Sequence, residues 1–260
     1  MLRYLLSRLN LPFISNADVE AKELHLSFDK ISSGIRILHL TDFHFHRKGR
    51  LEKKVKNIVR SLTFDIALFT GDYVDNLHHI DSFTEYIKSL NFSCPALAVP
   101  GNHDYRRNLS LIRRSLEEAG ITCMYNQHRS FKLRGNDLNI IGVGCPRMGQ
   151  DDFIQAVKHA DLSDSLNIVI SHTSDILQEI QLSPVKEEID LVLAGDTHGG
   201  QIDLPVVRQI CDLIYRLEYT RGLFRVNDQI LYVNRGLGTS LLPLRINCRP
   251  EVAILELVPG

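Results

Sequence analysis

Short apolar runs rich in β-branched residues recur along the chain, and stretches with helical spacing lie between several of them. The runs occupy residues 35–40, 65–70, 95–100, 138–143, 166–171 and 190–195, with two more at 229–234 and 252–257. Runs of this length are typical of strands buried on both faces. Apolar residues follow helical spacing at 51–62, 80–90, 109–119 and 174–180. Strands that alternate with helices predict an α/β layered fold.

The chain is expected to form one large domain. Its 260 residues allow one or two domains, and no linker rich in Pro, Gly, Ser or charge divides them. We expect residues 1–30 to hold an amphipathic segment and a lead-in strand, and residues 31–260 to form the main domain with a helical insertion at about 204–225. Leucines share one helical face within residues 2–9, which suits either a membrane interface or a helix docked on its own domain.

Polar residues follow five of the predicted strands at the point where each strand ends. Because ligands bind beyond the carboxyl ends of the strands in α/β sheets, these five loops are expected to converge on one crevice. The metal-capable side chains in these loops are Asp42, His44, Asp72, Asn102, His172, Asp196 and His198. Carboxylate, amide and imidazole groups without a thiolate suit Mn²⁺, Fe or Zn²⁺.

The number of candidate ligands predicts two metal ions. A mononuclear catalytic zinc uses three protein ligands and a water, so the candidate ligands exceed the need of one ion, and one carboxylate must bridge two. Two cations about 3.5–4 Å apart can share a hydroxide and clamp the attacking and leaving oxygens at phosphorus. The sequence therefore predicts hydrolysis of a phosphate ester.

A set of short motifs supports the same chemistry. D-x-H, G-D, G-N-H-D, H and G-x-T-H-G-G-Q occur in this order along the chain. They resemble the calcineurin-like metallophosphoesterase superfamily, and the resemblance covers about residues 35–257. Residues 195–201 and 235–257 resemble its bacterial subgroup typified by YaeI and YkuE, which also contains the LpxG type of UDP-2,3-diacylglucosamine pyrophosphatase. The resemblance implies two facing mixed β-sheets flanked by helices.

The resemblance also implies which metal each ligand would hold. The first metal would take Asp42, His44 and His198, the bridge would be Asp72, and the second metal would take Asn102 and His172. The family usually has His at the position of Asp196. We expect Asp196 to bind the second metal and to favour Mn²⁺ or Mg²⁺ there; the alternative is that it misses the metal.

The same resemblance suggests a proton donor. His103 would contact the phosphate and protonate the leaving oxygen, because an imidazole titrates near neutral pH. Asp104 is expected to orient His103. Among the other histidines, His39 lies inside a predicted strand and is expected to be buried with its hydrogen bonds satisfied, and His46 is expected at the rim of the crevice.

Arginines late in the chain are candidates for substrate binding. Arg235, Arg245 and Arg249 flank the last strands and could contact phosphate, because guanidinium matches phosphate oxygens bidentately. The insertion at about 204–225 is basic and amphipathic; it could hold an acyl chain or a headgroup, or only cover the edge of a sheet. The specific hypothesis is cleavage of UDP-2,3-diacylglucosamine to the lipid monophosphate and UMP in lipid A synthesis. The alternatives are a broad-specificity phosphodiesterase and a catalytically silent scaffold.

Composition narrows the partners and the compartment. The chain has 30 Lys and Arg against 31 Asp and Glu, so no global field attracts nucleic acid, and no nucleic-acid partner is expected. Its 5 cysteines form no C-x-x-C pair, which indicates a reducing compartment. With no signal peptide or spanning segment apparent, we expect a cytoplasmic protein, with peripheral contact at the inner membrane left open. The expected substrate is a small-molecule or lipid-linked phosphate ester, and the oligomeric state is not predicted.

Overall fold

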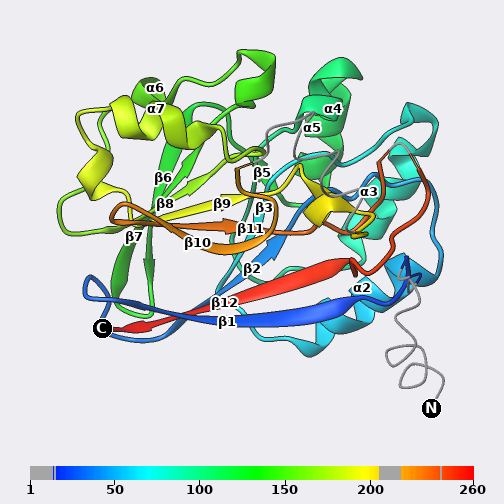
Figure 1. Ribbon diagram of the computed structural model, residues 1–260, viewed down its shortest axis with the longest axis horizontal. Helices are drawn as coiled ribbons and strands as arrows, with labels where there is room; N and C mark the ends of the chain where they lie inside the picture. Colours follow the sequence, from blue (N-terminus) through cyan, green and yellow to red (C-terminus); the bar gives the residue numbers. More distant parts are fainter. Residues whose placement is uncertain (1–13, 15, 205–217, 241) are drawn as a thin grey trace.

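Two mixed β-sheets pack face to face, with helices on their outer faces (Figure 1). The structure, a computed structural model, describes residues 14, 16–204, 218–240 and 242–260. In the order of hydrogen-bonded neighbours, the first sheet contains β1 (Glu20–Phe28), β12 (Glu251–Pro259), β2 (Ile35–Leu40), β3 (Ile66–Phe69), β4 (Ala96–Ala98) and β5 (Thr122–Cys123). The second contains β10 (Gly222–Val226), β11 (Gln229–Val233), β9 (Leu191–Ala194), β8 (Leu166–Ile170), β7 (Asn136–Gly142) and β6 (Gln127–Leu133). The predicted layered α/β fold with two facing sheets is confirmed.

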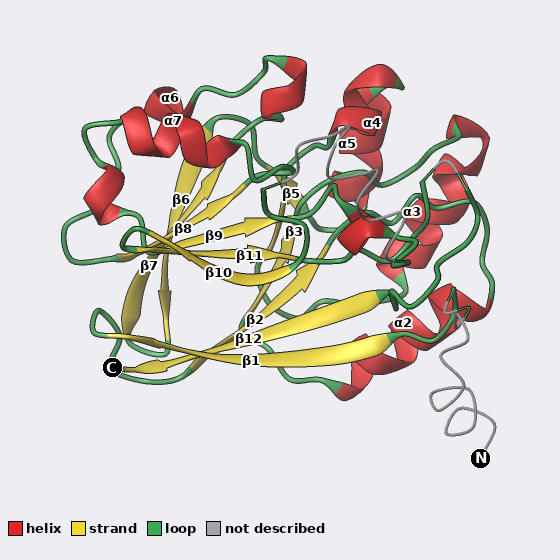
Figure 2. Ribbon diagram, in the orientation of Figure 1, coloured by secondary structure: helices red, strands yellow, loops and turns green. Residues whose placement is uncertain are grey.

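The helices cover the outer face of each sheet (Figure 2). The α-helices are α2 (Arg50–Ser61), α3 (Ile80–Lys88), α4 (Asn102–Arg106), α5 (Leu109–Glu118), α6 (Phe153–Val157) and α7 (Ile176–Leu182). Short 3₁₀ turns are η1 (Leu77–His79), η2 (Pro146–Met148), η3 (Lys186–Glu188) and η4 (His198–Gly200). The strands predicted at the apolar runs and the helices predicted at 51–62, 80–90, 109–119 and 174–180 are present, with each end within two residues of its expected position.

Three hydrophobic cores explain why the strands are apolar on both faces. Between the sheets, Ile37 and Leu68 of the first sheet share one core with Ile168 and Leu193 of the second. The outer face of the first sheet packs on α2, α3 and α5, and that of the second packs on α6 and α7. Because the central strands of each sheet lie between two apolar layers, polar side chains gather in the loops at their ends.

The strand directions place the polar loops together. β2, β3 and β4 are parallel neighbours in the first sheet, and β7, β8 and β9 are parallel neighbours in the second. The carboxyl ends of each parallel set therefore lie at one edge of its sheet, where ligands bind in α/β folds.

Three described strands that the sequence did not predict are β5, β6 and β10. β6 alternates exposed and half-buried positions, so it has no apolar run. β10 corrects the end of the expected helical insertion, because residues 222–226 pair with β11. A strand forms here since a tight turn at residues 227–228 returns the chain onto β11. Residues 218–221 are not helical either, and the other positions of the expected insertion, residues 205–217, lie outside the described residues, as do the leucines of residues 2–9.

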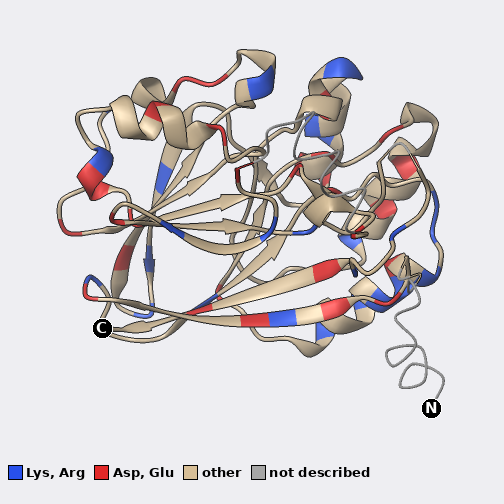
Figure 3. Ribbon diagram, in the orientation of Figure 1, with Lys and Arg blue, Asp and Glu red and all other residues tan. Residues whose placement is uncertain are grey.

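The edge strand β1 carries charges of both signs. Glu20, Lys22 and Glu23 lie along it (Figure 3). Charged side chains on an edge strand oppose pairing with another chain, so this edge is protected against aggregation. Within the described residues, no helix combines the length and apolar character needed to cross a membrane.

His39 is buried in the middle of β2, as predicted. Its Nε2 lies 2.9 Å from the Thr70 hydroxyl oxygen, whereas its Nδ1 has no hydrogen-bond partner among the described residues. The prediction that its hydrogen bonds are all satisfied is therefore wrong for Nδ1. Burial lowers the pKa of His39 to about 3, so the folded protein keeps this ring neutral at pH values where the unfolded chain protonates it.

His39 should make the protein less stable as the pH falls. Because its pKa is lower in the folded than in the unfolded chain, its full contribution is present above about pH 6.5 and is lost as pH falls toward the folded pKa. Between pH 7.5 and 5.5 the wild type should lose about 1.4 kcal/mol of unfolding free energy more than a His39→Gln variant. Urea unfolding of both proteins in a chelator at the two pH values measures this difference. Equal losses in the two proteins would show that His39 is not the cause.

Candidate metal centre

The five polar loops converge, as the sequence predicted. The loop after β2 is joined to the loop after β3, since the backbone N–H of Asp42 donates to Gly71 and that of His44 donates to Asp72. The loop after β9 of the second sheet is joined to the loop after β2 of the first sheet, since the backbone N–H of Asp196 donates to the Asp42 carboxylate at 3.0 Å. All of the predicted metal-capable side chains meet in this crevice, in two neighbouring clusters.

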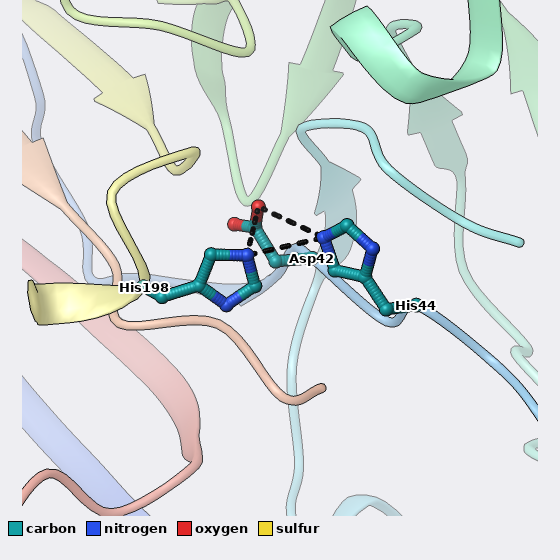
Figure 4. A group of neighbouring side chains, drawn as sticks. All are labelled: Asp42, His44 and His198. Atoms are coloured by element: carbon teal, nitrogen blue, oxygen red, sulfur yellow. Dashed lines mark hydrogen bonds and ion pairs between the residues drawn. The ribbon is translucent and has the colours of Figure 1, made fainter. Parts of the chain in front are cut away.

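The first cluster consists of Asp42, His44 and His198 (Figure 4). Asp42 Oδ1 lies 3.6 Å from His198 Nε2 and 4.0 Å from His44 Nε2, and the two Nε2 atoms are 3.1 Å apart. All three side chains are buried. One carboxylate oxygen and two imidazole nitrogens thus face a common point, as ligands of one ion do.

The second cluster surrounds His172 Nε2. Asn102 Oδ1 lies 3.0 Å from this nitrogen, Asp72 Oδ2 3.3 Å and Asp196 Oδ1 3.4 Å. The opposite ring nitrogen, Nδ1, donates to the carbonyl of Thr70 at 2.6 Å, which leaves Nε2 as the ligand atom. Asp72 Oδ2 is also 3.4 Å from His44 Nε2. Asp72 therefore faces both clusters, the position that a bridging carboxylate needs.

The charges in the crevice suit divalent cations. Asp42 Oδ1 is buried and accepts no hydrogen bond from the described residues. Burial, with help from the nearby Asp72 and Asp196, raises the pKa of Asp42 to about 6. A buried carboxylate oxygen without a donor is costly unless a cation neutralises it. The donor set of hard oxygens and imidazoles fits a pair of divalent ions.

Many of the site residues have a left-handed backbone. The positive φ angles are 50° at Asp42, 39° at His44, 58° at Asp72, 71° at Asp196 and 51° at His198. This conformation costs a residue other than glycine about 1–2 kcal/mol, and Asp, Asn and His tolerate it best. The chain therefore turns sharply at the strand ends, at a cost in stability that is concentrated in the site.

Close packing behind the ligands explains one of the glycines. A Cβ on Gly101 would lie 2.1 Å from Asp72 Oδ1. No side chain fits there, so Gly101 lets the loop after β4 approach the carboxylate of Asp72. The backbone N–H of His103 then donates to Asp72 Oδ1 at 2.9 Å, which leaves Oδ2 free to face the two clusters.

His103 is paired with Asp75 rather than with Asp104. Its Nδ1 lies 3.1 Å from Asp75 Oδ1, and the same oxygen is 2.8 Å from His44 Nδ1. Burial alone would raise the pKa of Asp75, but the hydrogen bonds to His103 and His44 outweigh it and hold the pKa well below its usual range. Asp75 was not among the predicted site residues, although it lies in the same loop as Asp72. His46 Nε2, as expected at the rim, lies 3.5 Å from Asp75 Oδ2.

The prediction that Asp104 orients His103 is wrong. The Asp104 carboxylate is fully buried and accepts three backbone N–H groups, from Gly101 at 2.7 Å, Asp72 at 2.9 Å and Tyr73 at 3.0 Å. These bonds tie the loop after β3 to the loop after β4. Asp104 therefore acts on the shape of the site and not on the imidazole.

The arginines predicted to bind phosphate have other partners. Arg245 is fully buried and donates to the carbonyls of Gly238, Arg235 and Gly236, so it cannot reach a substrate. Its guanidinium also lies 3.2 Å from His198 Nδ1. Burial, together with the neighbouring His44 and Arg245, holds the pKa of His198 well below its usual value, so this ring is neutral.

Arg235 is likewise committed elsewhere. It pairs with Glu251 and with Glu20, the latter at 2.9 Å, and so joins the end of β11 to β12 and β1. Arg249 is half-exposed and pairs with Asp18 at 3.0 Å; its contact with phosphate stays a prediction. A partly exposed arginine beside the metal site is Arg147 in η2, which pairs with Asp196. It follows β7 just as the ligands follow their strands, so the same rule applied to that strand would have found it.

Comparison with known proteins agrees with this geometry. The calcineurin-like phosphoesterase family matches residues 35–200, so the chain belongs to this family. It is accordingly a metal-dependent phosphoesterase, a hydrolase. In its fold it is similar to the NAD nucleotidase NadN of Haemophilus influenzae, with a TM-score of 0.53 and 16% identity over 78% of this chain and 50% of that one.

Bacterial relatives cover most of the chain. The uncharacterized metallophosphoesterase YkuE of Bacillus subtilis is 32% identical over 86% of this chain and 79% of its own. Phosphodiesterase YaeI of Escherichia coli is 32% identical over 89% of this chain and 85% of its own. The UDP-2,3-diacylglucosamine pyrophosphatase LpxG of Chlamydia trachomatis is 27% identical over 86% of this chain and 83% of its own. The resemblance seen in the motifs is confirmed.

Proposed function

We propose that the protein hydrolyses a phosphodiester or pyrophosphate bond with two divalent metal ions, most concretely that of UDP-2,3-diacylglucosamine, to give the lipid monophosphate and UMP. The observation that carries the two-metal mechanism is the position of Asp72 between the clusters around His44 and His172. Asp42, His44 and His198 would hold one ion, and Asn102, His172 and Asp196 the other. Mn²⁺ suits the donor set best, with Fe, Zn²⁺ and Mg²⁺ as alternatives.

The residues around the ions have separate tasks. Two divalent cations supply Lewis acidity and a nucleophile at neutral pH. His103 has a partly exposed side chain, with 27% of its surface accessible, so it can approach a leaving oxygen and give it a proton. Asp75 holds His103 Nδ1, which fixes the ring and leaves Nε2 for proton transfer. Asp104 ties the loop after β3 to the loop after β4, which holds Asp75 and His103 at a fixed separation.

A hollow beside the site supports a substrate larger than phosphate. It has a volume of about 510 Å³ and lies between α7 and the segment from Glu218 to the end of β10. Its lining combines apolar side chains, namely Leu177, Leu182, Tyr219 and Val226, with polar ones, namely Ser174, Gln178, Gln181, Glu218, Asp175 and Arg147, the last of which pairs with Asp196. Such a mixture suits a ligand with a polar head and an apolar remainder. A lipid-linked substrate would bring the protein to the inner membrane from the cytoplasm.

The relative YaeI supports a second candidate, a phosphodiesterase of broad specificity, because its identity to this chain is 32% against 27% for LpxG. Both candidates use the same metals and the same His103. They differ in whether the enzyme depends on the lipid and nucleotide parts of the substrate.

One assay separates the two candidates. Metal-stripped protein, re-supplied with Mn²⁺, is offered bis(p-nitrophenyl) phosphate and UDP-2,3-diacylglucosamine in parallel, with a chelator-treated sample as the control. We expect metal-dependent release of UMP, at a kcat/KM at least tenfold above that for the aryl ester. Faster cleavage of the aryl ester would favour the broad phosphodiesterase. Absence of hydrolysis of both substrates would contradict the proposed function and leave the catalytically silent scaffold as the alternative.

A further inference from the structure

Arg147 joins two carboxylates at the edge of the second metal cluster. Its Nη1 pairs with Asp196 Oδ2, and its Nε lies 3.1 Å from Asp175 Oδ2 at the start of α7. We propose that Arg147 is a positioning residue for the second metal ion: it holds Asp196 Oδ2 so that only Oδ1 points at the ion. This inference rests on the proposed two-metal site and adds residues that the family motifs do not contain.

The two oxygens of Asp196 face different neighbours. Oδ1 lies 3.4 Å from His172 Nε2, the atom that Asn102 and Asp72 also approach. Ligand atoms bound about 2.1 Å from one octahedral ion lie about 3.0 Å apart, close to the separations seen here. Oδ2 is held by the guanidinium on the other side. Asp196 therefore sits as a one-oxygen ligand whose second oxygen is already satisfied.

The shape of the arginine side chain suits this task. Guanidinium carries several N–H donors in a rigid fork, so Arg147 can hold Asp175 and Asp196 at the same time. Asp175 anchors the fork on α7, and 38% of the Arg147 side chain remains exposed against 7% for Asp196. A lysine at this position would keep the charge but could not span both carboxylates. The backbone N–H of Asp196 is tied to Asp42, which fixes its other end.

Charge alone predicts the opposite effect. Arg147 is a cation beside a cation site, so by simple Coulomb repulsion its removal would strengthen metal binding. A positioning role predicts that removal of Arg147 weakens metal binding, because the Asp196 carboxylate can then rotate away from the orientation in which Oδ1 faces the ion. Loss of a residue that orients a metal ligand typically costs about 10- to 100-fold in metal affinity. The two explanations therefore differ in the sign of the change.

The test is a titration of the metal-stripped, full-length protein with Mn²⁺. Calorimetry measures the binding of each equivalent, and EPR measures the signal of a spin-coupled Mn²⁺ pair. Arg147→Gln should weaken the second Mn²⁺ equivalent at least about tenfold and reduce the coupled signal, with the first equivalent unchanged. Arg147→Lys should also weaken it. Arg113→Gln is the matched control, since Arg113 is an exposed arginine that pairs with Glu117 on its own helix. Thermal unfolding of the metal-free variants checks that each one folds.

A double variant locates the effect at Asp196. If Arg147 acts through Asp196, then Arg147→Gln adds little to the loss already caused by Asp196→Asn, so the two changes are not additive. Equal or tighter binding of the second Mn²⁺ by Arg147→Gln would overturn the inference, and so would full additivity. Because the readout is metal binding, this outcome is distinct from failure of the proposed function. That failure would appear as wild-type protein that binds two Mn²⁺ but hydrolyses neither substrate.

Discussion

Asp72→Asn is expected to lower hydrolysis at least about a thousandfold, because removing the shared carboxylate separates the two metal clusters. Asp72 Oδ2 lies 3.4 Å from His44 Nε2 and 3.3 Å from His172 Nε2, so a single side chain serves both. Metal ions contribute several kcal/mol of transition-state stabilisation, and each 1.4 kcal/mol is about tenfold in rate. Asparagine keeps a side chain that tolerates the left-handed backbone at this position.

The measurement is kcat together with the Mn²⁺ content of the purified variant. Asp228→Asn, at an exposed position in the turn between β10 and β11, is the matched control and should behave as wild type. Activity of Asp72→Asn within tenfold of wild type would contradict the two-metal mechanism.

His103→Asn is expected to lower kcat about 10²- to 10⁴-fold while leaving metal binding unchanged. General acid catalysis by a positioned side chain contributes in this range. The contact of residue 103 with Asp72 is made by the backbone N–H, so the substitution removes the imidazole and keeps the loop. The loss should be smaller for an aryl ester than for an alkyl ester of phosphate, because an aryl oxide leaves as a stable anion whereas an alkoxide needs a proton.

The control for this variant is His159→Asn. His159 is exposed and has a φ of 67°, which asparagine adopts readily, so the change should alter neither kcat nor stability. Equal losses for both leaving groups in His103→Asn would argue that His103 binds substrate and does not deliver a proton.

The metal ligands could be predicted because their position depends on topology. In parallel strands that are buried on both faces, polar residues occur mainly beyond the strand ends, and the carboxyl ends lie at one edge of the sheet. Asp42 and His172 are 130 positions apart by their residue numbers, yet each follows a buried strand. The same rule does not reach a strand such as β6, which is half exposed and carries no apolar run.

Side-chain pairing could not be predicted in the same way. Asp104 is next to His103 in sequence, but both lie in α4, where neighbouring side chains point about 100° apart and do not face each other. Asp75 lies in the loop after β3, and only the fold brings it within hydrogen-bond distance of the His103 imidazole. Arg245 has the same limit, since its carbonyl partners are presented by a turn that only the folded chain defines.

The order of strands in the first sheet also has a consequence for biosynthesis. β12 is hydrogen-bonded between β1 and β2, although it is the last of the described strands to leave the ribosome. Until then β1 lacks its neighbour in the sheet, and β2 is an open edge. The loop with Asp42 and His44 therefore reaches its final support only after translation of residues 251–259. During synthesis the strands of the second sheet, which end at residue 233, can pair before β12 completes the first sheet.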